Sequence, residues 1–150
     1  MWIELIVCYF ATVAFGVIFN GPTRIIWIGG FIGVSSWFIY SLAPVYTDAS
    51  FVFATAVASL VAATLSHVFA KWFRVPVTNF SIQGIIPLVP GSKAYFTMRA
   101  FLDGEYIEGI ELGIDTLLQA GAIAGGLVFA LAIFSFGKGG IGQRYEEKRS

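Results

Sequence analysis

Long stretches without charge alternate with short connections that carry either cations or acids, and this alternation constrains the fold more than any other feature. Arg24 follows the first apolar stretch, Asp48 follows the second, and Lys71 with Arg74 follows the third. A chain threaded back and forth across a bilayer gives this pattern, because cationic connections are retained in the cytoplasm. We therefore predict an all-α integral membrane protein of about five transmembrane helices, with its N-terminus outside and its C-terminus inside.

The composition fits a membrane environment and argues against several classes of function. Hydrophobic residues make up 57% of the 150 residues and charged residues 12%, whereas soluble domains carry about 25% charged residues. The formal net charge is zero, so no nucleic-acid partner is expected. A single cysteine, Cys8, and a single histidine, His67, do not make a metal site by themselves. The sequence has no nucleophile–base or nucleotide-binding motif, so we expect no enzyme activity, cofactor or metal.

The apolar stretches have the length of membrane-spanning helices, which is about 20 residues. Predicted spans cover residues 2–19, 25–42, 51–70, 80–102 and 112–136, with an acidic connection at 103–111. No cation precedes Arg24, so the first stretch is predicted as a retained helix rather than a signal peptide. Residues 1–136 then form one transmembrane helical domain, and residues 137–150 form a short basic tail in the cytoplasm.

The fourth stretch differs from the others because prolines interrupt it. Pro87, Pro90 and Gly91 fall within five residues, and each proline removes an amide donor and clashes with the preceding turn. We predict two half-helices around a break between Pro87 and Ser92, where Gly91 lets the backbone turn and Ser92 caps the second half. The free amides of that helix end would attract a carboxylate. A structural kink and a re-entrant segment are the alternatives, and crossing is preferred because re-entry would move the acidic connection inside.

Lys93 and Arg99 are two cations that no cytoplasmic connection accommodates. Charged residues inside a membrane usually face a protein interior or a watery cavity, because their burial in lipid is expensive. Lys93 is predicted near the midplane, where it either lines a substrate path or pairs with another helix, because no acidic residue lies three or four positions away. Arg99 is predicted to add charge to that path, or else to reach the outer interface or pair with Asp103 one turn on.

The fifth stretch carries Asp115 and Gln119 one turn apart on one face of the predicted helix. Intramembrane carboxylates commonly relay protons, so these residues are candidates for proton coupling. Asp115 has no special role if it lies at the outer interface. Two glycine pairs, 29 with 33 and 121 with 125, have the spacing that permits close packing of helices.

Residues 85–95 read Ile-Ile-Pro-Leu-Val-Pro-Gly-Ser-Lys-Ala-Tyr. This stretch resembles the signature of the threonine/serine exporter family, in which an apolar segment with two prolines and a glycine is followed by a tyrosine. It is most similar to the short subunit of the split form of that family, the YjjB-like proteins. The resemblance extends to residues 19–24 and to the last span around Gln119, and so covers nearly the whole chain.

The resemblance implies an all-helical, multi-pass subunit in a bacterial cell membrane, with a longer exporter subunit as its partner. It implies export of threonine and serine driven by the proton motive force, and some split members are associated with dicarboxylates such as succinate. The signature positions carry over as Pro87, Pro90, Gly91 and Tyr95. Two units with an odd number of helices, joined end to end, have opposite orientations, as in the inverted repeats of many secondary transporters.

We therefore predict a subunit of a proton-coupled secondary exporter of small amino acids. The substrate carboxylate would bind at the candidate residues Pro87, Pro90, Gly91, Ser92, Lys93, Tyr95 and Arg99. Asp115 and Gln119, or a carboxylate on the partner, would carry the proton. The alternatives are an exporter of small dicarboxylates, a passive channel, an exporter made of copies of this chain alone, and an accessory subunit that does not transport.

Overall fold

The structure is a computed structural model that describes residues 2–46 and 51–136. All regular structure in these residues is helical, which confirms the predicted all-α fold. The elements are α1 Trp2–Ile18, α2 Thr23–Tyr46, α3 Phe51–Phe73, α4 Thr78–Ile85, the 3-10 helix η1 Ile86–Leu88, α5 Gly91–Leu102 and α6 Tyr106–Phe136. The predicted tail at 137–150 and Asp48 of the second connection lie outside the described residues.

Three of the described helices are long and apolar enough to cross a membrane: Thr23–Leu42 within α2, all of α3, and Tyr106–Ser135 within α6. α1 is a shorter apolar helix of 17 residues, and the fourth predicted span is divided between α4 and α5. Large apolar side chains are exposed on α1, α2, α3, α5 and α6, which is expected where lipid rather than water covers the surface. The chain is an all-α membrane protein, while the number of crossings and their orientation stay predictions.

α1 and α2 form an antiparallel hairpin that depends on glycines at the contact. A Cβ on Gly30 would lie 2.7 Å from the ring of Tyr9, and a Cβ on Gly33 would lie 2.7 Å from Thr12. The close packing predicted around Gly33 is therefore confirmed, because a side chain there would force the two backbones apart. Gly29, its predicted partner, makes room for α4 instead.

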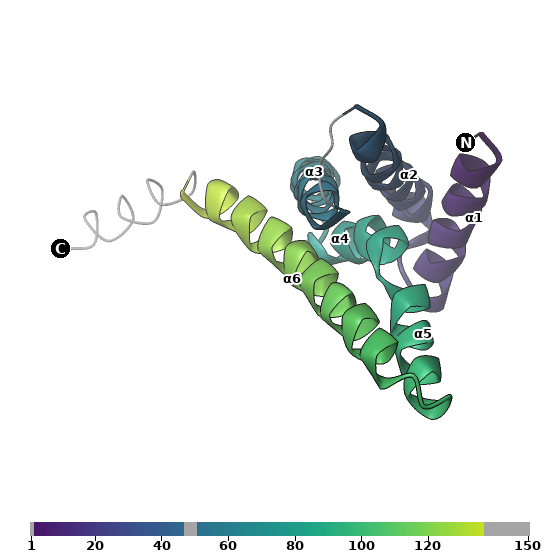
Figure 1. The fold of residues 1–150 in the computed structure, drawn as a ribbon. Helices are drawn as coiled ribbons and strands as arrows, with labels where there is room; N and C mark the ends of the chain where they lie inside the picture. Colours follow the sequence, from purple (N-terminus) through teal and green to yellow (C-terminus); the bar gives the residue numbers. More distant parts are fainter. Residues whose placement is uncertain (1, 47–50, 137–150) are drawn as a thin grey trace.

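α4 lies at the centre of the fold among α1, α2 and α3 (Figure 1). Phe80 on α4 is fully buried, in a core cluster with Ile25, Ile32, Ala62 and Ala70. The last carbonyls of a helix have no partner within the helix, and lipid offers none. The Ser36 hydroxyl on α2 supplies one, because it donates to the Gly84 carbonyl over 2.7 Å.

α3 and α6 pack side by side and run in the same direction. Ser59 contacts the Ala122 carbonyl at 3.4 Å, and further along both helices His67 stacks on Phe134 with ring centroids 4.6 Å apart. α4 and η1, residues 78–88, therefore return along α3 before the α5–α6 hairpin begins. A chain that crosses at the fourth segment has this parallel arrangement, whereas a re-entrant segment would make α6 antiparallel to α3.

The glycines of α6 pack differently from the prediction. A Cβ on Gly121 or Gly125 would meet no atom within 4 Å, so the predicted close packing of this pair does not occur among residues 2–46 and 51–136. The contact with α3 is made one position later, where a Cβ on Gly126 would overlap the Ser59 hydroxyl. The reason is the helical period, since neighbouring positions point about 100° apart and only one of them faces α3.

α5 and the first half of α6 form an antiparallel hairpin that projects from the rest of the fold (Figure 1). The chain turns at Gly104, which has a φ of 84° that other residues rarely adopt. The predicted acidic connection at 103–111 is too long, because α6 already begins at Tyr106. Glu108 lies in its first turn, where the helix dipole favours a negative charge.

Candidate functional site

The predicted break is present between α4 and α5, with slightly different limits. α4 ends at Ile85, η1 follows with Pro87 in its first turn, and Val89 is extended with a ψ of 125°. α5 then begins at Gly91. Both prolines lie outside regular α-helix, as expected from the missing amide donor of this residue.

The prediction that Ser92 caps the second half-helix is wrong. Pro90 occupies the N-cap position of α5, no side chain caps this end, and Ser92 already lies inside the first turn. Gly91 has no positive φ, and a Cβ there would meet no atom within 4 Å. Pro90 itself sets the start of α5, since its ring fixes φ near the helical value and the helix continues without a hydroxyl cap.

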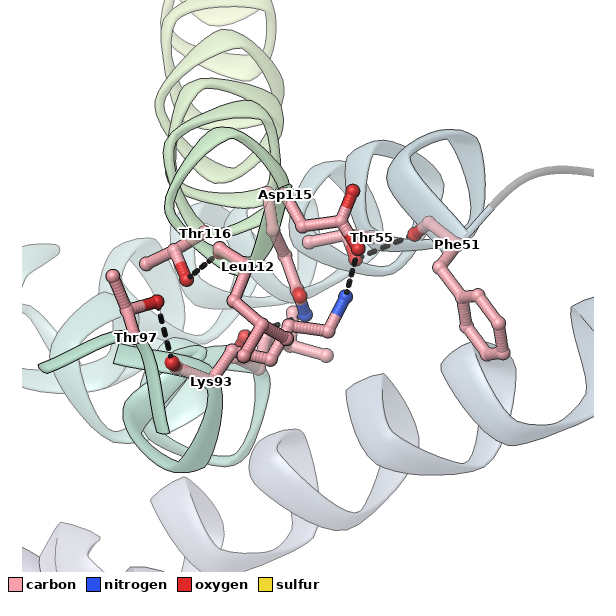
Figure 2. Close-up of polar contacts among 9 residues, drawn as sticks. Phe51, Thr55, Lys93, Thr97, Leu112, Asp115 and Thr116 are labelled. Atoms are coloured by element: carbon pink, nitrogen blue, oxygen red, sulfur yellow. Dashed lines mark hydrogen bonds and ion pairs between the residues drawn. The ribbon is translucent and has the colours of Figure 1, made fainter. Parts of the chain in front are cut away.

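Lys93 pairs with a carboxylate on another helix, one of the two alternatives that the sequence left open. Its Nζ atom lies 3.3 Å from Oδ2 of Asp115 on α6 (Figure 2). The same Nζ lies 5.8 Å from the ring centroid of Phe51, at the start of α3. The Lys93 side chain is 31% exposed and that of Asp115 is 58% exposed. Lys93 therefore lies level with the first turn of α3 rather than with its middle, while its depth in the membrane stays a prediction.

Gln119 joins the same region from one turn further along α6. The residue is only 5% exposed, and its Nε2 atom donates to the carbonyl oxygen of Leu88 in η1 over 3.4 Å. Leu88 is fully buried. We call Leu88, Lys93, Asp115 and Gln119 the break site, because they connect both sides of the interruption to α6.

Two further candidate residues, Pro87 and Tyr95, have different surroundings. Pro87 lines a cavity of about 350 Å³ between α1, α2 and η1, together with Cys8 and Trp37. Tyr95 is exposed and packs edge-on against Phe96, 5.5 Å away.

Arg99 follows the local alternative considered for it. Its Nε atom donates to Asp103 over 3.4 Å, one turn away on the same hairpin, and both side chains are largely exposed. In this structure the second cation is paired within its own hairpin rather than with a residue of the break site.

Asp115 also lines an open groove of about 1110 Å³ along the turn and the first half of α6. Three further acids line it: Glu105, Glu108 and Glu111. The described residues hold no group of three or more His, Cys, Asp or Glu side chains that would bind a metal ion. The charged groups of the region are thus one ammonium and several carboxylates.

Sequence reasoning missed Gln83, the most buried polar residue of α4. It is 3% exposed, and its side chain fills the space where a Cβ would lie on Gly16 of α1 and on Gly29 of α2. The sequence feature that could have indicated Gln83 is the one that indicated Gln119, namely an uncharged amide within an apolar stretch. The two glycines lie far from it in sequence, so nothing local pointed to the contact.

Comparison with known proteins places these features in a family. No curated protein and no solved structure shows significant similarity to the chain. The family described as threonine/serine exporter, ThrE, matches residues 4–133 of the 150. The match spans the break, the α5–α6 hairpin and all four residues of the break site. The chain therefore belongs to the threonine/serine exporter family, a family of membrane transporters.

Proposed function

We propose that this chain is one subunit of a proton-coupled exporter of threonine and serine in the bacterial cell membrane, and that the break site binds the substrate. The observation that carries the proposal is the contact of 3.3 Å between Lys93 and Asp115 at the interruption of α4 and α5. A cation and an anion held side by side complement a zwitterion, since an amino acid carries one charge of each sign on a single carbon.

Binding would proceed by exchange of ionic partners. The substrate carboxylate replaces Asp115 at the Lys93 ammonium, and the substrate ammonium takes the carboxylate of Asp115. Both new contacts are charge-assisted hydrogen bonds, which are roughly twice as strong as neutral ones. A dicarboxylate fits this pair less well, because its second carboxylate would lie beside Asp115 and meet like charge.

Proton coupling follows from competition for Asp115. A proton and the substrate ammonium both need the same ionised carboxylate, so protonation from the outside releases the substrate there. The proton then leaves on the inside, and the next substrate binds the ionised form. Glu105, Glu108 and Glu111 line the groove that ends at Asp115, and their negative charge would concentrate cations, including protons, near it.

A second chain is needed to close this site. In the single chain the Asp115 side chain is 58% exposed, yet a transport path has to be sealed from lipid on every side. We propose that the longer exporter subunit covers the open face of the α5–α6 hairpin. An isolated copy of this chain would then bind lipid at that face and transport nothing.

The test is efflux of labelled threonine from proteoliposomes that contain this chain, the longer subunit, or both, with and without an acidic outer buffer. Efflux that requires both chains and the gradient is the expected result. Asp115→Asn should lower it at least about tenfold and abolish its dependence on outer pH, since a neutral amide takes up no proton. The matched control is Asp103→Asn, which removes the other carboxylate of the hairpin that pairs with a cation.

Other outcomes would replace the proposal with a defined alternative. Efflux that persists after the gradient collapses indicates a channel, and efflux from this chain alone indicates an exporter made of its copies. Efflux from the longer subunit alone makes this chain an accessory. Efflux of succinate in preference to threonine would contradict the zwitterion site.

A further inference from the structure

We infer that Gln119 determines the specificity of the exporter for hydroxyl-bearing amino acids, by accepting a hydrogen bond from the substrate hydroxyl. The inference rests on the proposed function, because it assumes that the break site binds the substrate. It assigns to Gln119 a role different from proton coupling, since an uncharged amide neither takes up nor releases a proton near neutral pH.

The orientation of the Gln119 amide follows from its one partner. The carbonyl oxygen of Leu88 only accepts hydrogen bonds, so the atom of Gln119 that faces it over 3.4 Å must be the amide nitrogen. The other end of the same amide, Oε1, is buried and has no donor within hydrogen-bond distance among the described residues. A buried acceptor without a donor is unfavourable, and it is satisfied when a ligand brings the donor.

The residue that carries this acceptor is a neighbour of the proposed ligand site along α6. Gln119 and Asp115 lie four residues apart on α6, and side chains at that spacing are neighbours, with Cβ atoms about 5–6 Å apart. In threonine and serine the hydroxyl is on the carbon next to the one that carries the ammonium and the carboxylate. A molecule held by Lys93 and Asp115 therefore has its hydroxyl within reach of a group about one helical turn away.

The neighbouring hydroxyl side chains are held against their own helices instead. Thr97 donates to the Lys93 carbonyl over 2.8 Å, and Thr116 donates to the Leu112 carbonyl over 2.7 Å (Figure 2). Thr55 on α3 donates to the Phe51 carbonyl over 2.7 Å. Gln119 is thus the buried side chain of this region that has an oxygen without any hydrogen bond.

The competing explanation is that Gln119 only braces the break through Leu88. The two roles use different atoms of the amide, because the brace uses the nitrogen and the substrate contact uses the oxygen. Gln119→Leu removes both atoms, whereas Gln119→Glu keeps an oxygen acceptor and loses the amide nitrogen. The pair of variants therefore separates the two explanations.

The experiment measures efflux of L-threonine and of L-2-aminobutyrate, which is threonine without its hydroxyl, from proteoliposomes that contain the chain and the longer subunit. The wild type should prefer threonine, and Gln119→Leu should lower the ratio of the two rates about tenfold, as expected for one hydrogen bond. Gln119→Glu should retain the preference for threonine. The measured quantity is the ratio of the threonine rate to the L-2-aminobutyrate rate. A general loss of transport in either variant lowers both rates and leaves this ratio unchanged.

Two results would overturn the inference while the proposed function stands. One is a wild-type complex that transports both compounds equally. The other is a Gln119→Leu variant in which both rates fall by the same factor, as a brace on Leu88 predicts. If the wild-type complex transports neither compound, the proposed function fails and the inference fails with it.

Discussion

Two buried glutamines, Gln83 in α4 and Gln119 in α6, have similar chemistry and different surroundings. They are 3% and 5% exposed, and each has an amide oxygen without a hydrogen-bond partner in the described part of the chain. The backbone of α1 and α2 packs closely around Gln83, because Gly16 and Gly29 leave room for this side chain and little else. Gln119 instead lies one turn from the Lys93–Asp115 pair, whose side chains remain partly exposed.

The two glutamines show two different reasons for a buried polar side chain, which are helix packing and substrate recognition. A polar side chain inside a membrane protein is a candidate functional residue by default, because it costs free energy. Gln83 shows a second reason for its presence, which is to fill a slot between two glycines and hold α4 against α1 and α2. Gln119 has no such slot, and a small polar ligand has access to its neighbours. Substitutions at these two positions and at the charged residues nearby test this distinction.

The largest effect is expected for Lys93→Met, which keeps the length of the side chain and removes its charge. Threonine efflux should fall about 100-fold, because hydrogen bonds to charged groups contribute about 1.5–3 kcal/mol. Labelled threonine in proteoliposomes with both subunits measures the effect. Lys71→Met, at an exposed cation near the end of α3, is the control and should transport normally. Equal efflux from both variants would remove Lys93 from the substrate site.

Gly29→Ala should destabilise the fold by about 1–3 kcal/mol, the usual range for overpacking a filled site. The added Cβ would overlap the Gln83 amide, which the surrounding helices hold in place. Thermal unfolding in detergent measures the change, and Gly125→Ala, in open space, serves as the control. Adding Gln83→Ala to Gly29→Ala should recover part of the loss. If Gly29→Ala and Gly125→Ala unfold alike, the slot does not hold α4.

Gln83→Leu should leave threonine efflux within about twofold of the wild type, since an apolar side chain of similar size fills the slot and removes an unpaired oxygen. The same change at position 119 is expected to reduce the preference for threonine over L-2-aminobutyrate. Parallel efflux assays of the two variants measure this contrast directly. A selective loss of threonine transport in Gln83→Leu would make the α4 slot part of the substrate path.

The smallest effect is expected for Arg99→Ala, which breaks the exposed ion pair with Asp103. Pairs of this kind on helix surfaces contribute about 0.3–0.5 kcal/mol, so the unfolding temperature should hardly change. The efflux rate should also stay the same, because this pair does not contact the break site. A large loss of efflux with normal unfolding would return Arg99 to the list of substrate residues.

Local features of the sequence were sufficient to predict much of this architecture. The number of apolar residues in a row predicts membrane helices, and Pro87 with Pro90 predicts an interruption of the fourth one. The pairing of Arg99 with Asp103 was also accessible, because residues four apart on a helix are neighbours. In each case the residues that interact are close in sequence, so the helical period alone relates them.

The tertiary structure decided which distant residues meet. Lys93 and Asp115 are 22 positions apart, and Ser36 and Gly84 are 48 apart, so no helical period connects them. The same holds for the glycines of α6, where Gly126 rather than Gly125 faces α3. A helical membrane protein with a broken segment and a few polar residues inside it can be predicted from the residues alone. Only packing decided that Gln83 fills a closed slot while Gln119 adjoins an open, charged site, because burial and partners depend on how the helices pack together.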